Sequence, residues 1–296
     1  MYPAYQLGFW LSNRLPRAQA LRLAEALGGW SYRLAPGNRH AVEQNIGLVA
    51  GNHSLDERDR LTREVFRNFG RYLVEFSTAH RAPSPDVTVD GWEHLTAAQA
   101  AGRGVLILTG HFGNWELGAA VLRRRGVRLV AVALPHAGRR MNALFDRQRS
   151  RLGVPVIPLG RGAAAAVLRA LRQEQAVAVV GDQEFGRHGV PVALCGRWVI
   201  WPAGPATLSL RSGAPVVPSV LVREGPWRFR LCLDAPIWPD PGMDSGMLTQ
   251  RYAAAFERRV TRDPAQWLLF RPVEAAPDTG RALAGPAHGN GSSRRG

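Results

Sequence analysis

The chain has 296 residues, and its hydrophobic content of 46 % excludes a mainly disordered protein. Its formal charge of +15 comes from arginine alone, since the sequence contains no lysine, and would suit an anionic membrane surface or an acidic carrier protein. A basic chain can also bind nucleic acid. The arginines are scattered and no zinc-finger, homeodomain or RNA-binding signature is visible, so we expect no nucleic-acid partner.

Residues 1–35 are predicted to form two amphipathic helices. The first apolar run ends before Pro16, well short of the roughly 20 residues that span a bilayer, and it lacks the features of a signal peptide. Phe9, Trp10 and Trp30 would be interfacial anchors if the helices lie on a membrane surface. The same apolar faces could instead cover the core of the following domain, since helical periodicity does not separate these alternatives.

Residues 36–273 are predicted to form a single α/β domain. Apolar residues recur at steps of three and four over residues 56–79, which indicates a helix with one face in the core. Short β-rich segments then alternate with helical ones, which indicates a mainly parallel central sheet flanked by helices. The predicted strands are residues 87–89, 105–109, 129–133, 156–158 and 176–180, with residues 216–221 and 229–233 as a hairpin-like pair.

The stretch 105–116 contains the candidate catalytic residues. Its first five residues, VLILT, are typical of a strand buried on both faces, and a helix begins near Trp115 with Asn114 as N-cap. His111 therefore lies in the turn above the carboxyl end of a strand, where open α/β sheets bind ligands.

His111 and Glu116 suggest acid–base chemistry. They are five positions apart, so a regular helix cannot hold both on one face, but Gly113 would let the backbone fold so that the carboxylate meets the imidazole. The imidazole could then take a proton from an alcohol that attacks an acyl group, while N–H groups of residues 112–114 help to hold the oxyanion. Taken alone, the spacing also fits a turn histidine beside a solvated acid.

Asp182 and Gln183 are expected beside His111, because right-handed crossovers bring the ends of the strands before Gly110 and Gly181 to one edge of the sheet. Asp182 is interpreted as a structural or substrate-orienting group, with a turn-forming aspartate as the alternative. A magnesium site is not favoured, since no second cluster of acids accompanies these residues.

The end of the chain changes in composition. A helix is predicted over residues 243–262, with its apolar residues in one stripe. After Glu274 the sequence consists mainly of Ala, Gly, Pro, Ser and Arg without apolar periodicity, so residues 274–296 are expected to be disordered.

Several motifs resemble, in order, those of the bacterial lipid A biosynthesis (lauroyl/myristoyl) acyltransferase family. They span roughly residues 38 to 272, and the family belongs to the glycerolipid acyltransferases that share a motif of His, four residues and an acid. The matching segments are GHFGNWE at 110–116, DQ at 182–183, GPA at 204–206, RSGAPVVP at 211–218 and PAQW at 264–267.

The resemblance implies transfer of a fatty acyl group from acyl-CoA or an acyl carrier protein to a hydroxyl of a glycolipid or lysophospholipid, without a metal or other cofactor. His111 would be the general base and Glu116 its orienting acid, with Asn114, Asp182 and Gln183 near the substrate. Family members that modify lipid A usually begin with a transmembrane anchor. Because no such segment is predicted here, we expect peripheral attachment to the cytoplasmic face of the cell membrane.

Arg140 and Arg151 are the candidates for binding a phosphate of the donor, since guanidinium can hold a phosphate with two parallel hydrogen bonds. Arg151 also matches an arginine of the family's pattern. The other arginines of the predicted helix 139–152 are expected on its solvated face. A helix is predicted to begin at Ala203–Ala206 with Pro205 in its first turn, and its free N–H groups could meet a phosphate or the oxyanion; ordinary helix initiation is the alternative.

Two alternatives remain at this point. Actinobacterial relatives that acylate phosphatidylinositol mannoside place Asp where this chain has Glu116, so this activity is a second enzymatic hypothesis. A non-catalytic basic protein that binds membrane or nucleic acid is the alternative of another class.

Overall fold

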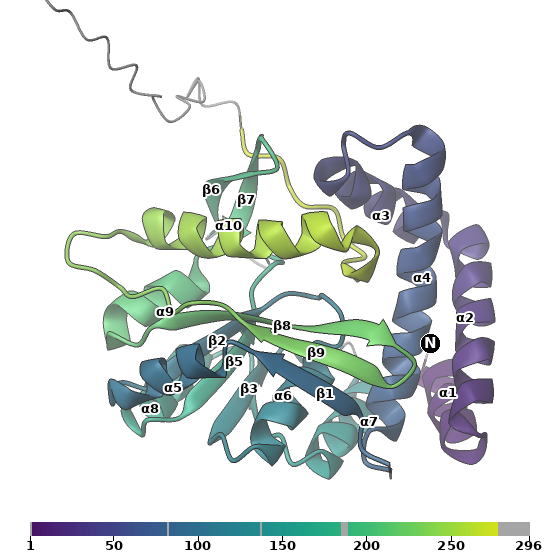
Figure 1. Cartoon of the computed structure of the whole chain (residues 1–296), viewed down its shortest axis with the longest axis horizontal. Helices are drawn as coiled ribbons and strands as arrows, with labels where there is room; N and C mark the ends of the chain where they lie inside the picture. Colours follow the sequence, from purple (N-terminus) through teal and green to yellow (C-terminus); the bar gives the residue numbers. More distant parts are fainter. Residues whose placement is uncertain (1, 82, 137, 185–188, 278–296) are drawn as a thin grey trace, which may run out of the picture.

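A seven-stranded sheet lies at the centre of the computed structural model, which describes residues 2–81, 83–136, 138–184 and 189–277. Its strands are β1 (Asp86–Asp90), β2 (Val105–Thr109), β3 (Leu129–Ala133), β4 (Val156–Pro158), β5 (Ala176–Val180), β8 (Val216–Gly225) and β9 (Arg228–Leu233). They are ordered β1-β9-β8-β2-β5-β3-β4, and every neighbouring pair except β8–β9 is parallel (Figure 1). The predicted α/β fold with a mainly parallel sheet is therefore confirmed.

Helices cover both faces of the sheet because successive strand residues point to opposite sides. In β2, Val105 and Ile107 join one buried cluster, whereas Leu106 and Leu108 join the other. Among the helices that follow β1, those that contribute to the first cluster are α5 (Trp92–Ala100), α6 (Trp115–Arg124) and α7 (Arg139–Arg151). Those that contribute to the second are α8 (Ala163–Arg172), α9 (Gly204–Ser212) and α10 (Ser245–Arg262).

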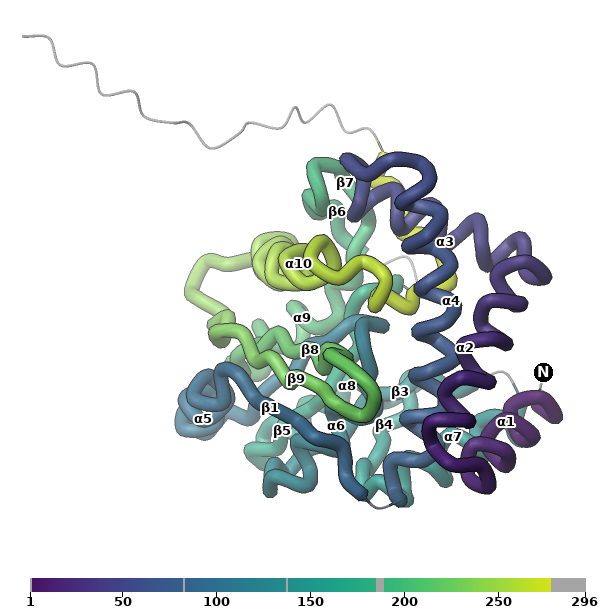
Figure 2. The backbone as a smooth tube through the Cα atoms, turned by 45° about the vertical axis from the view of Figure 1, so that its right-hand side comes forward, coloured from purple at the N-terminus to yellow at the C-terminus, as the bar shows by residue number. Residues whose placement is uncertain are grey.

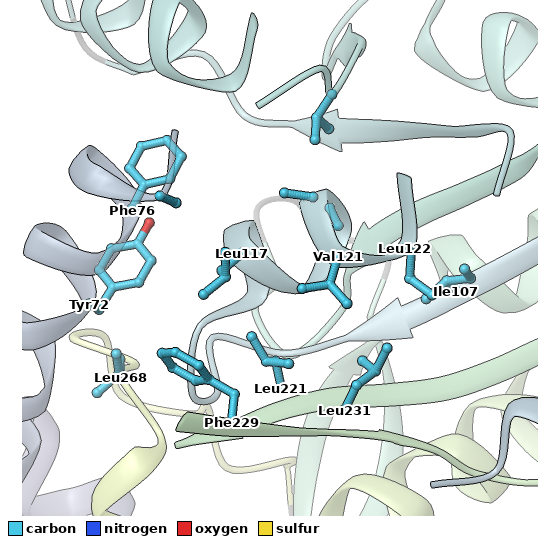
Figure 3. Packing of buried hydrophobic residues seen from close by; sticks show 14 of the residues in the cluster. Tyr72, Phe76, Ile107, Leu117, Val121, Leu122, Leu221, Phe229, Leu231 and Leu268 are labelled. Atoms are coloured by element: carbon cyan, nitrogen blue, oxygen red, sulfur yellow. The ribbon is translucent and has the colours of Figure 1, made fainter. Parts of the chain in front are cut away.

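Helix α6, which directly follows the His111 turn, is deeply buried. Leu117, Val121 and Leu122 of this helix belong to the same buried cluster as Ile107 of β2 and Leu221 of β8, and Figure 3 shows Leu122 beside Ile107. Leu117 is fully buried. Truncating a side chain in such a position typically lowers the free energy of unfolding by about 2–5 kcal/mol, so its packing holds α6 firmly in the core. The turn that carries His111 is therefore attached to a rigid element.

Four helices precede the sheet in the chain and stand along one side of it: α1 (Tyr2–Arg14), α2 (Arg17–Leu34), α3 (Pro36–Val49) and α4 (Leu55–Thr78) (Figure 1). Phe9 of α1 is buried and packs its ring against Phe76 of α4 and Phe145 of α7. Helices α2 and α4 cross closely at Gly28 and Gly70, where a Cβ atom would overlap the backbone of the other helix. The N-terminal helices therefore cover part of the protein's own core.

The opposite sides of α1 and α2 keep an exposed apolar stripe. We call Leu7, Trp10, Leu23, Leu27, Trp30 and Leu34 the N-terminal apolar stripe; each is at least 40 % exposed. Figure 2 shows α1 and α2 outside α4, on the edge of the molecule. Trp10 and Trp30 are thus placed as anchors would be, whereas the same prediction for Phe9 is wrong because its ring is buried. No helix among the described residues is long and apolar enough to cross a bilayer.

A separate hairpin, β6 (Gly189–Leu194) and β7 (Arg197–Pro202), lies next to α10. The chain after the short helix η1 (Pro264–Gln266) returns to this hairpin, where Ala275 pairs with Val199. The Ile200 N–H donates to the Glu274 carbonyl at 2.8 Å, and the Ala276 N–H donates to the Trp198 carbonyl at 3.0 Å. The start of the predicted disordered tail is therefore ordered, and residues 278–296 lie outside the described residues.

Candidate active site

The turn between β2 and α6 holds His111 in a fixed position. Asn114 caps α6, with its Oδ1 accepting from the Leu117 N–H at 3.1 Å. Gly113 has a φ of +59°, and a Cβ atom there would overlap the Leu221 carbonyl oxygen. Only glycine fits this conformation and this close approach.

Asp182 binds His111 at two points. Asp182 Oδ1 accepts from the imidazole Nδ1 at 2.8 Å, and Oδ2 accepts from the His111 backbone N–H at 2.8 Å. The Trp267 Nε1–H donates to the same Oδ2 at 2.9 Å. Because a buried carboxylate accepts these bonds, Nδ1 carries the proton and Nε2 is left as the basic nitrogen of the neutral imidazole.

The pKa values of this pair move in opposite directions. Burial alone would lower the pKa of His111, but the charge and hydrogen bond of Asp182 outweigh burial and raise it above its ordinary value. Burial would raise the pKa of Asp182, but the charge of His111 and the hydrogen bonds from His111 and Trp267 lower it overall. The carboxylate therefore stays ionised and stabilises an imidazolium when one forms.

Glu116 does not orient His111, so this expectation is wrong. Its carboxylate accepts from Arg149 of α7, from Nη2 at 2.6 Å and from Nε at 3.0 and 3.1 Å. Both side chains are less than a tenth exposed. The helical start of α6 directs Glu116 toward α7, whereas the neighbouring strand β5 delivers Asp182 to the imidazole.

Asn114 is not positioned to bind substrate, which corrects a second expectation. It is fully buried, and besides capping α6 it donates from Nδ2 to Glu75 of α4 at 2.9 Å. Glu75 in turn accepts from Arg223 of β8 at 2.6 and 2.7 Å. This network connects three elements around the turn and leaves Asn114 a structural role.

Two of the N–H groups in the predicted oxyanion site at residues 112–114 already have backbone partners. The Gly113 N–H donates to the Gln266 carbonyl at 2.9 Å, and the Asn114 N–H donates to the Leu221 carbonyl at 3.1 Å. These two groups hold the turn against η1 and β8. They are therefore not available to an oxyanion in this conformation.

His111 opens onto a large cavity at the carboxyl ends of β2, β3 and β5. The cavity has a volume of about 950 Å³, and the imidazole is a quarter exposed. Trp115 packs edge-on against the imidazole with 5.0 Å between ring centroids. Gln183 lies on the lining as expected. A cavity of this size is typical of a small-molecule or lipid site.

The lining of the cavity differs between the two faces of the sheet. On the side of α6 and α7 the polar Tyr72, Glu116, His136 and Arg149 lie among apolar residues such as Ala119 and Phe145. On the side of α8 and α9 it is mostly aliphatic, with Ala163, Val167 and Leu208, and its polar residues there are Thr207 and Arg211. His111 therefore stands where a polar and an apolar part of one cavity meet.

The arginines of α7 do not lie as expected. Arg140 and Arg151 are exposed and are not among the lining residues, so their assignment as phosphate ligands in the cavity is not supported. Arg149, expected on the solvated face, is instead buried with Glu116. The other arginines on the lining are Arg211 and Arg271.

Trp267 also belongs to the site, although its sequence motif assigns it no role there. The motif PAQW matches the family, but nothing in its pattern indicates a hydrogen bond to a carboxylate 85 positions earlier. The signal available was an indole N–H, which usually has a partner when the ring is buried. Trp267 is nearly fully buried, so its ring also shields Asp182 from water.

The site combines a histidine–aspartate pair with a large, partly apolar cavity, an arrangement found in enzymes that use acid–base chemistry. The sequence signature of the bacterial lipid A biosynthesis acyltransferases covers residues 3–273, and the chain belongs to this family. It is therefore an acyltransferase, and the resemblance seen in its motifs is confirmed.

The individual relatives include enzymes with two kinds of glycolipid acceptor. Phosphatidylinositol mannoside acyltransferase of Mycolicibacterium smegmatis is 28 % identical over 282 residues, covering 90 % of each chain. Lipid A biosynthesis palmitoleoyltransferase of Escherichia coli is 28 % identical over 288 residues, also covering 90 % of each chain. Among solved structures, 1-acyl-sn-glycerophosphate acyltransferase of Thermotoga maritima aligns with a TM-score of 0.39 and 14 % identity, covering 84 % of this chain and 96 % of that one.

Proposed function

We propose that the protein transfers a fatty acyl group from acyl-CoA or an acyl carrier protein to a hydroxyl of a glycolipid or lysophospholipid, with His111 as general base. The observation that carries this proposal is the 2.8 Å contact between His111 Nδ1 and buried Asp182, on an imidazole that faces the cavity. Apart from the acyl donor, the reaction needs no cofactor.

In the proposed mechanism, the acceptor hydroxyl gives its proton to His111 Nε2 as its oxygen attacks the thioester carbonyl. The imidazolium that forms is stabilised by Asp182, and it returns the proton to the sulfur as the carbon–sulfur bond breaks. The products are an ester and a free thiol, so no covalent acyl-enzyme is required.

The two sides of the cavity support this assignment. The aliphatic side along α8 and α9 suits a fatty chain, while the side with Trp115, Glu116 and Arg149 suits a polar acceptor. Gln183 would contact the substrate between them. Two acceptor classes fit, lipid A precursors and phosphatidylinositol mannosides, because relatives of both names are equally similar to this chain at 28 % identity.

Attachment to the membrane surface is also part of the proposal. The N-terminal apolar stripe follows helical spacing, with Leu23, Leu27, Trp30 and Leu34 separated by steps of four, three and four. Exposed Arg14, Arg22 and Arg33 lie on the same two helices, which suits an anionic lipid surface. We place the enzyme peripherally on the cytoplasmic face of the cell membrane, where acyl-CoA and acyl carrier protein are available.

The test is an acyl-transfer assay with purified protein, labelled palmitoyl-CoA or acyl carrier protein, and either a lipid A precursor or a phosphatidylinositol mannoside. His111→Ala should lower turnover about 10²–10⁴-fold while circular dichroism stays unchanged. Near-normal turnover of this variant would reject His111 as the base. Vesicle or oligonucleotide binding without cleavage of any thioester would instead favour the non-catalytic alternative.

A further inference from the structure

Arg271 lies on the lining of the same cavity as His111. The chain that carries it runs beside the His111 turn, where Phe112 forms an antiparallel bridge with Trp267. The Leu268 N–H donates to the His111 carbonyl at 2.6 Å. The segment that holds the catalytic pair in place therefore continues directly to Arg271.

The backbone on both sides of Arg271 is held by one buried side chain. Asn45 of α3 donates from Nδ2 to the carbonyls of Leu269 and Arg271, at 3.0 and 2.8 Å. Its Oδ1 accepts from the Val273 N–H at 3.0 Å. Asn45 is only 3 % exposed, so these bonds form in a protected environment. The position of the Arg271 backbone is fixed although its side chain is exposed.

The guanidinium of Arg271 has no hydrogen bond or ion pair with any other residue that the structure describes. Arg149, by contrast, is neutralised by Glu116 on the same lining. A guanidinium presents five N–H donors in a planar fork that matches the oxygens of a phosphate. Arg271 thus offers an unneutralised guanidinium for an anion at the cavity, carried on a backbone that Asn45 holds in place.

We propose that Arg271 binds a phosphate group of one of the two substrates and so positions that substrate for reaction at His111. This inference rests on the proposed function. The phosphate belongs either to the coenzyme A or phosphopantetheine part of the donor, or to a phosphorylated lipid acceptor. Both sources present the same chemistry to the guanidinium.

The first experiment measures equilibrium binding by calorimetry and needs no turnover. The probes are coenzyme A and glycerophosphoinositol, tested on the wild type, Arg271→Ala, Arg271→Lys and a control, Arg262→Ala. Arg262 is an exposed arginine at the end of α10 that is not on the cavity lining. Loss of a charge-assisted pair should weaken one probe about ten- to hundredfold in Arg271→Ala, and less in Arg271→Lys.

The probe that is affected identifies the source of the phosphate. Weakened binding of coenzyme A points to the donor, and weakened binding of glycerophosphoinositol points to the acceptor. The proposal is overturned if the wild type binds neither probe, or if Arg271→Ala binds both as tightly as Arg262→Ala does.

A second experiment separates this inference from the proposed function. With acyl-CoA as donor, a donor-phosphate contact predicts a tenfold or larger rise in KM for Arg271→Ala, which disappears with an acyl N-acetylcysteamine thioester that lacks phosphate. An acceptor-phosphate contact predicts a higher acceptor KM with both donors. If the wild type binds a probe through Arg271 but transfers no acyl group, the proposed function is rejected and the phosphate site is kept. If acyl transfer occurs and Arg271→Ala has the same KM values as Arg262→Ala, the phosphate site is rejected and the proposed function is kept.

Discussion

The cavity contains two ion pairs that differ in what they can do. Arg149 and Glu116 are both buried and bind each other through two nitrogens of the guanidinium. The second pair, His111 and Asp182, joins a buried carboxylate to an imidazole that is a quarter exposed and whose pKa the charge and hydrogen bond of Asp182 raise above its ordinary value, against the effect of burial. The first pair fixes α6 against α7. Because the second pair has a protonatable and accessible partner, we assign the proposed proton transfer to it.

The strongest way to test this contrast is to remove the charge of Asp182. In Asp182→Asn, the amide keeps the shape but neither fixes the same tautomer nor stabilises the imidazolium, so kcat should fall about 10²–10⁴-fold. The measurement is steady-state acyl transfer at saturating substrate. Turnover within a few-fold of the wild type would remove Asp182 from the mechanism.

The other pair should matter for stability before it matters for chemistry. Glu116→Gln leaves the buried Arg149 charge with only Asp146, at 3.3 Å, so the free energy of unfolding should fall by about 3–5 kcal/mol. Urea denaturation measures this change. Asp240→Asn, which breaks an exposed pair with Arg251, is the matched control and should have little effect. Equal stability of the two variants would contradict the assigned role of Glu116.

The pH dependence should follow the His111–Asp182 pair. Because Asp182 raises the pKa of His111, kcat/KM should rise with pH through a midpoint above the ordinary histidine value of about 6.5. The residual activity of Asp182→Asn should have a lower midpoint. Stability should change with pH in the opposite direction to kcat/KM. The pair contributes fully to the free energy of unfolding below the ordinary histidine pKa, and this contribution is lost as pH rises through the raised pKa of His111. Identical midpoints in the two proteins would argue against the coupling.

The smallest expected effect concerns the N-terminal apolar stripe. Replacing Leu27 and Trp30 together by serine should weaken binding to vesicles with anionic lipid about tenfold or more, since a lipid surface would supply only part of the roughly 1.5–3 kcal/mol that full burial of one such side chain contributes. Cosedimentation with vesicles measures this. Met247→Ser changes an exposed apolar residue of α10 and serves as control. If both proteins bind alike, the stripe is not the membrane contact.

The sequence predicted the sheet and the approach of Asp182 to His111 because both depend on strand order. The alternation of strands and helices predicts parallel strands, and β2 and β5 are parallel neighbours in the sheet. Gly110 and Gly181, which directly follow these strands, therefore lie at the same edge of the sheet. The pairing of Glu116 could not be predicted in this way. It depends on the direction of α6 relative to α7, which is set by packing between elements far apart in the sequence.

The sequence also could not predict which face of α7 is buried. Because arginines are spread around this helix, its composition does not single out one face. The structure buries Phe145, Gln148 and Arg149, and contacts such as the hydrogen bond from Gln148 Nε2 to the Phe76 carbonyl, at 2.6 Å, fix this orientation. Arg140 and Arg151 consequently point elsewhere. The capping function of Asn114 was predicted, but its bond to Glu75 required knowledge of α4.

The most direct test of the central claim is an NMR titration of ¹⁵N-labelled His111 in the wild type, Asp182→Asn and Glu116→Gln. Partnership with Asp182 predicts that the wild type and Glu116→Gln share a neutral Nδ1–H tautomer and a raised His111 pKa, while Asp182→Asn loses both. Loss of these features in Glu116→Gln, with Asp182→Asn unchanged, would contradict the account.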